Sequence, residues 1–63
     1  MRDFKTRLVN EQKELEERIT KLETFLESQD SYEIDPVQRM LLVIQLNAMR
    51  TYNECLEARL SLL

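Results

Sequence analysis

The amino-acid sequence predicts an all-α fold, in which an antiparallel two-helix hairpin assembles with copies of itself into a homo-oligomeric helical bundle. Three observations support this prediction. The 63 residues include no glycine and one proline, and residues with high helix propensity dominate the chain. Only one short segment interrupts the helical pattern. The chain is also shorter than the roughly 70–80 residues at which a single core usually suffices for stability.

A chain this short needs a further source of stability, and its composition leaves self-assembly as the remaining one. A single cysteine cannot form a disulfide within the chain, and a chain with one cysteine and no histidine does not fit a structural zinc site. We therefore expect a homo-oligomer that holds no metal and no cofactor.

The first helix is expected over residues 3–27, in a single domain that covers residues 1–63. It carries a narrow seam with alternating steps of four and three residues, which is heptad spacing. The seam consists of Leu8, Gln12, Leu15, Ile19, Leu22 and Leu26. The rest of this helix is charged, with opposite charges one turn apart such as Glu14 and Arg18.

Residues 28–35 are expected to form the loop, because they are rich in side chains that compete for backbone hydrogen bonds. The loop ends in a helix-start signal. Asp35 fits the N-cap, Pro36 fits the first helical position, and Gln38 completes a capping box. The second helix is therefore expected over residues 36–62.

The second helix has two apolar stripes, of which a hairpin can cover only one. The first stripe is Val37, Leu41, Ile44, Ala48, Tyr52 and Cys55. The second is Leu42, Leu46, Met49, Leu56, Leu60 and Leu63. A short loop makes the helices antiparallel. The numbers of two residues that contact each other across the hairpin should therefore add up to about 63. We expect the first stripe to pack on the first helix, with Cys55 buried as a small apolar side chain, and the second stripe to form the oligomer core.

The composition argues against several classes of function. Without histidine, a glycine-rich phosphate loop or an activated nucleophile, the chain is not expected to be an enzyme. The net charge of −3 argues against a nucleic-acid partner, and no apolar segment has the length of a membrane span. With no signal-peptide pattern and a lone thiol, a cytoplasmic location is expected.

Two polar residues occupy seam positions at the end of the hairpin opposite the loop. Gln12 and Arg59 stand where aliphatic residues would pack better, and such residues often set the register or the oligomeric state. Arg59 is also positioned to stack on Phe4. Alternatively, several subunits bring Arg59, Tyr52 and Gln12 together around a small anionic ligand, because arginine offers forked donors to phosphate and tyrosine offers a stacking face.

A second candidate ligand surface lies on the polar side of the second helix. Arg39 and Arg50 are eleven residues apart and nearly aligned, and Arg39 lies close to the helix N-terminus. Tyr32 in the loop could cover a bound base. The alternative interpretation is a solubilising surface beside a mobile loop tyrosine.

Two segments resemble a family of small helical-hairpin phage proteins best known from crAss-like phages of gut bacteria. The resemblance lies in residues 14–26 and, more distinctively, in the run Q-L-x-A-M-x-x-Y-x-x-C-L-x-x-R over residues 45–59. This family has no established catalytic motif to transfer. The chain is also similar in build, though not in motif, to small phage proteins that oligomerise and sequester nucleotide immune messengers between subunits.

These resemblances imply a phage-encoded anti-defence protein in the host cytosol. It would bind a cyclic dinucleotide or a cyclic ADP-ribose-type nucleotide at subunit interfaces. The alternative is an interaction module that docks the apolar face of the second helix on a host or phage protein.

Overall fold

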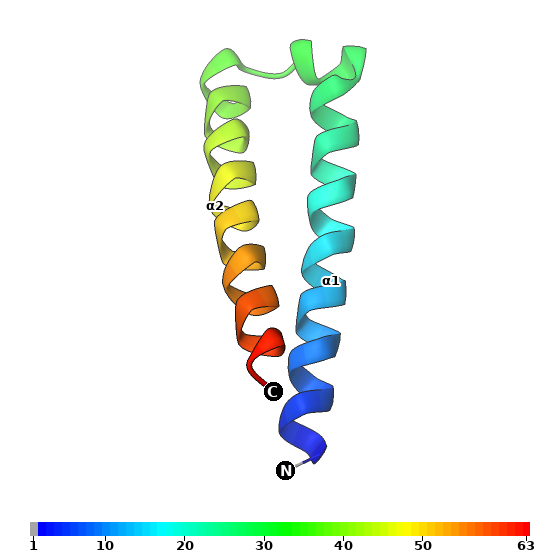
Figure 1. Ribbon diagram of the computed structural model, residues 1–63. Helices are drawn as coiled ribbons and strands as arrows, with labels where there is room; N and C mark the ends of the chain where they lie inside the picture. Colours follow the sequence, from blue (N-terminus) through cyan, green and yellow to red (C-terminus); the bar gives the residue numbers. More distant parts are fainter. Residues whose placement is uncertain (1) are drawn as a thin grey trace.

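The computed structural model describes residues 2–63, with side chains described from Asp3 onward, and shows a helical hairpin (Figure 1). Helix α1 spans Arg2–Glu27, the 3-10 helix η1 spans Gln29–Tyr32, and helix α2 spans Pro36–Ser61. The bounds of both α-helices differ by one residue from those expected. The hairpin measures 46 × 14 × 13 Å. Below, the end at η1 is called the loop end, and the end where α1 begins and α2 finishes is called the open end.

The loop end is held by a cap on α2. The Asp35 side chain accepts a hydrogen bond from the backbone N–H of Gln38 at 3.2 Å, and Pro36 occupies the first helical turn. This is the expected N-cap, and it supplies one half of the predicted capping box. The helix boundary is thus defined by the residues that the sequence indicates.

A buried polar cluster closes the C-terminus of α1. The Ser31 side chain is fully buried, with its hydroxyl 3.0 Å from the Leu26 carbonyl oxygen and 2.9 Å from that of Ser28. Arg39 donates from Nη2 to the Leu26 carbonyl at 3.0 Å and from Nε to Ser31 Oγ at 3.3 Å. Its guanidinium lies 4.2 Å from the centre of the Tyr32 ring. Arg39 therefore satisfies a carbonyl that the end of α1 leaves without a helical partner.

The core forms along the seam of α1 and the second apolar stripe of α2. The buried residues are Leu8, Leu15, Ile19 and Leu26 from α1, with Leu46 and Leu56 from α2. The partly buried residues packed against them are Leu22, Phe25, Leu42, Met49 and Leu60. The prediction that the first stripe of α2 would pack on α1 was wrong, because large leucine and methionine side chains fill this space better than a stripe containing Ala48 and Cys55.

The first stripe of α2 remains exposed as a result. Val37 and Ile44 are each 56% exposed, and Leu41 is 49% exposed. Cys55 is also exposed, so the prediction of its burial was wrong. In one protomer, the surface that lacks a covering element is therefore this stripe, and not the second.

Candidate functional site

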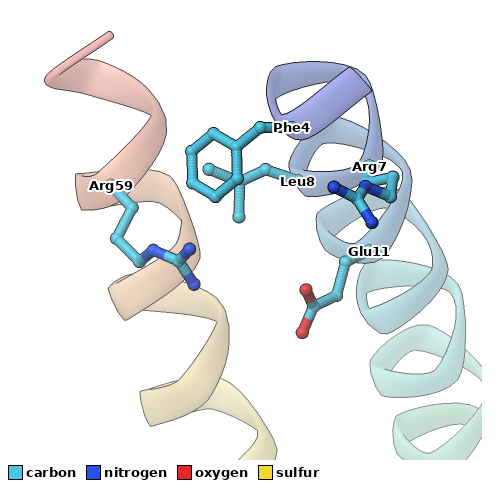
Figure 2. A pocket seen from close by; sticks show the side chains of 5 residues that line it. All are labelled: Phe4, Arg7, Leu8, Glu11 and Arg59. Atoms are coloured by element: carbon cyan, nitrogen blue, oxygen red, sulfur yellow. The ribbon is translucent and has the colours of Figure 1, made fainter. Parts of the chain in front are cut away.

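The open end contains a pocket of about 340 Å³ between the two helices. It is lined by Phe4, Arg7, Leu8 and Glu11 from α1 and by Arg59 from α2. Figure 2 shows Phe4 and Leu8 lying between the helices, with Arg59 on the α2 side and Glu11 extending its carboxylate from α1. The volume lies near the lower end of the roughly 300–1,000 Å³ typical of small-molecule sites.

Each wall of the pocket carries an arginine, Glu11 adds a negative charge on the α1 wall, and the Phe4 ring lies between the walls. The Arg59 guanidinium lies 5.9 Å from the centre of the Phe4 ring, near the limit for a cation–π contact. This contact matches the expected pairing of positions 4 and 59. The Arg7 Nε donates to the Asp3 carbonyl oxygen at 3.3 Å, one turn earlier in α1.

Both pocket arginines keep donors available for a ligand. Among the side chains that the structure describes, the ion pairs are Arg18 with Glu14 at 3.9 Å and Arg50 with Glu23 at 2.6 Å. Arg7 and Arg59 take part in neither pair. A guanidinium offers five donors in a planar fork, which suits a phosphate or a carboxylate. The arrangement can therefore bind an anion that also presents a flat apolar surface.

Only one of the six predicted ligand-binding residues lines this pocket. Arg59 does so, while Arg39 and Tyr32 meet each other at the loop end. Arg39 and Arg59 are twenty residues apart on one helix, which corresponds to about 30 Å along its axis. Within one protomer, these two arginines cannot contact the same nucleotide.

The other three predicted residues lie between the two ends. Gln12 donates from Nε2 to Asn53 Oδ1 at 3.1 Å and so links the two helices. The two residue numbers add up to 65, close to the expected sum of about 63. Arg50 Nη2 donates to Glu23 Oε2 across the hairpin. The Tyr52 side chain, on α2, is 45% exposed. Within one protomer the six residues therefore form no single site.

Two pocket residues, Arg7 and Glu11, were not predicted from the sequence. A signal for them exists, because Phe4, Arg7, Leu8 and Glu11 follow the spacing i, i+3, i+4, i+7 and so share one face of α1. In the sequence, the charged positions of this face belong to the charged remainder of the first helix. Their place opposite Arg59 becomes apparent only when α2 is set against α1.

A larger hollow of about 400 Å³ lies in the half of the hairpin nearer the loop end. Its lining is mostly apolar and includes Phe25 and Met49, and its cations are Lys21 and Arg18. Because Arg18 is paired with Glu14, this hollow offers fewer free forked donors than the open end. The open-end pocket is therefore the stronger candidate for an anionic ligand.

Two further properties concern the described part of the chain. Over residues 2–63, neither helix combines the length and the apolar character needed to cross a membrane. Within the same residues, no group of three or more cysteine, aspartate and glutamate side chains is placed to hold a metal ion.

Comparison with known proteins gives one match. No curated protein and no solved structure matches the chain. The model of the family described as Sequestin matches residues 2–62, which is nearly the whole sequence. The name of the family points to the sequestration of a ligand. With this match over both helices and the connection between them, the chain belongs to the Sequestin family.

Proposed function

We propose that the protein is a phage-encoded anti-defence protein that sequesters a nucleotide immune messenger, of the cyclic dinucleotide or cyclic ADP-ribose type, at the subunit interfaces of a homo-oligomer. Membership of the Sequestin family supports the sequestering role. The observation that carries the choice of a nucleotide is the open-end pocket, where Arg7 and Arg59 flank the Phe4 ring.

Each lining residue has a role in this proposal. Arg7 and Arg59 neutralise the phosphates through charge-assisted hydrogen bonds, which are roughly twice as strong as neutral ones. Phe4 supplies a face on which a base stacks. The Glu11 carboxylate repels phosphate, so it faces the ribose or the base, where it accepts hydrogen bonds from hydroxyl or amino groups.

The subunit interface enters the proposal because the pocket is small and open. A site that binds a small molecule tightly usually covers 70–90% of the ligand surface. The two walls of one hairpin leave the outer side of a nucleotide exposed, so a second subunit is needed to cover it. Tyr52 and Gln12 remain candidates for contacts in the assembled protein.

Sequestration implies binding without turnover. The chain contains no histidine to act as a base near neutral pH, and the one carboxylate of the pocket stands beside two arginines rather than a nucleophile. We therefore propose that the ligand is released unchanged when the protein is denatured.

Native mass spectrometry with cyclic dinucleotides and cyclic ADP-ribose isomers tests the proposal. The expected result is a discrete oligomer that gains mass in steps of one nucleotide, and chromatography of the heat-denatured complex should return intact ligand. Recovery of a cleaved ligand would identify an enzyme instead. An oligomer that binds no member of the panel would contradict the choice of messenger.

The exposed first stripe of α2 favours a second candidate function. With Val37 and Ile44 more than half exposed, this surface also suits an interaction module that docks on a host or phage protein. Such a module would compete with its own self-association. Light scattering across a dilution series separates the two functions, because a closed assembly keeps its mass while a module gives a concentration-dependent mixture.

A further inference from the structure

We propose that the outer face of α2 pairs with the same face of a second copy in antiparallel orientation, around a two-fold axis that passes near residues 49 and 50. This face is called the outer seam. Its residues follow alternating steps of four and three: Val37, Leu41, Ile44, Ala48, Thr51, Cys55, Ala58 and Leu62. The inference rests on the homo-oligomer of the proposed function and names its interface, but it requires no nucleotide.

The first argument is that the outer seam is uncharged and unused by the hairpin. All eight residues are exposed in the protomer, and none carries a charge. A solvated helix face would be expected to carry charged side chains, as the outer face of α1 does. Heptad spacing over an entire helix is instead typical of a surface that packs against another helix.

The second argument is the area. Val37, Leu41 and Ile44 are about half exposed, and Met40 and Tyr52 beside them are 55% and 45% exposed. Together with the smaller seam residues, they present on the order of 600 Å² of apolar surface, which is at the upper limit for soluble monomers. A stable interface buries about 800 Å² on each partner. The outer seam with its flanks therefore provides most of what a dimer requires.

The third argument selects a second copy as the occupant, and it fixes the orientation. Large residues occupy three of the first four positions of the outer seam, and small residues occupy three of the last four. We place the two helices antiparallel, in the register where the numbers of two facing residues add up to 99. In this register Leu41 meets the partner's Ala58, and Ile44 meets the partner's Cys55. Parallel pairing would set large against large and small against small, which leaves both clashes and voids.

This pairing also brings the partner to the open-end pocket. Arg59 would lie beside the partner's Met40 and the partner's Leu41, because positions 59 and 40 sum to 99. Leu41 and Arg59 are separated by five full turns, so they project from the same side of α2. The partner therefore supplies an apolar wall next to Arg59, where one protomer leaves the pocket open.

Cysteine cross-linking without ligand tests the inference. In a Cys55→Ser background, Thr51→Cys places two thiols on opposite helices only about 4.5 Å apart along the axis, whereas Val37→Cys places them about 38 Å apart. Oxidation should convert T51C to a covalent dimer and leave V37C uncrosslinked. Cross-linking of both variants would show a parallel pair, and cross-linking of neither would overturn the interface.

A matched pair of substitutions tests the same interface in solution. Ile44→Asp places a charge on the outer seam and should halve the mass measured by light scattering. Val43→Asp changes an adjacent residue, 37% exposed, that lies off the seam, and it should leave the mass unchanged. Equal effects of the two substitutions, or a monomeric wild-type protein, would overturn the inference.

The two proposals fail separately in these experiments. Cross-linking as expected, together with no nucleotide binding, would contradict the proposed function alone. Nucleotide binding by an oligomer in which T51C does not cross-link would contradict the outer seam alone.

Discussion

The two ends of the hairpin each place an arginine of α2 beside an aromatic ring, but the two arginines have different surroundings. At the loop end, Arg39 stacks on Tyr32 and also donates to the Leu26 carbonyl and to Ser31. At the open end, Arg59 lies near a ring, and no acceptor is within hydrogen-bond distance among the described side chains and backbone. Arg39 therefore helps to hold the fold, whereas Arg59 keeps its hydrogen-bond donors free.

The direction of α1 explains this difference. Its C-terminus lies at the loop end and leaves carbonyl groups without helical partners, which an arginine can satisfy. Its N-terminus lies at the open end and presents N–H groups, which offer nothing to a donor such as Arg59. The C-terminus of α2 lies at the same end, and its dipole has the opposite sense, so the charges that favour an anion here are those of the Arg7 and Arg59 side chains. The polarity of α1 thus gives Arg39 a backbone acceptor at the loop end, and Arg59 has no equivalent acceptor from α1 at the open end.

The largest expected effect on stability comes from Arg39→Ala. This substitution removes the donors to Leu26 and leaves the buried Ser31 without one of its partners, so we expect a loss of about 2–3 kcal/mol in the free energy of unfolding. Arg59→Ala should change it by less than about 0.5 kcal/mol. Urea denaturation followed by circular dichroism, at one protein concentration, measures both values. Equal losses would remove the distinction between the two ends.

The next effect concerns affinity and should be confined to the open end. Arg59→Ala or Arg7→Ala removes a charged hydrogen bond worth about 1.5–3 kcal/mol, which corresponds to a roughly 10–100-fold weaker affinity for the nucleotide. Arg18→Ala is the matched control, because Arg18 lies outside the pocket, and it should change affinity less than about twofold. Titration calorimetry at two salt concentrations measures all three. A loss for Arg18→Ala as large as for Arg59→Ala would indicate only a general effect of charge.

A smaller effect tests the rigidity of the loop end. Asp35→Ala removes the N-cap of α2 and should cost about 1 kcal/mol of stability. Asp35→Asn should be nearly neutral, because asparagine caps a helix about as well as aspartate. Thermal unfolding of the two variants gives the comparison. A loss for Asp35→Asn equal to that for Asp35→Ala would mean that charge, and not the cap, stabilises this boundary.

Much of the hairpin could be predicted from local sequence signals. The cap at Asp35 and Pro36 locates the loop without reference to the rest of the chain. The axial level of the helices also follows from the loop length, as the Gln12–Asn53 hydrogen bond and the Phe4–Arg59 contact show.

The rotation of α2 about its own axis could not be predicted in the same way. Two apolar stripes satisfy the helical period equally well, and the choice between them depends on side-chain volume in three dimensions. The misplacement of Cys55 followed from this choice. The roles of Arg39 and Arg7 were also beyond the sequence, because they depend on the backbone or side chains that lie opposite each residue in the hairpin.

The smallest effect concerns Arg50, which lies between the two ends and pairs with Glu23. The two side chains are 48% and 38% exposed, so solvent screens the ion pair. Glu23→Gln should therefore change stability by only about 0.5 kcal/mol, and high salt should remove the difference.

The substitution also frees the guanidinium, which makes it a test of Arg50 as a ligand residue. Arg50 lies nine residues from Arg59, about 14 Å along α2, so the nucleotide affinity should remain unchanged. A tighter complex in Glu23→Gln would show that the pair withholds Arg50 from the ligand and that the binding surface extends from the open end toward the middle of the hairpin.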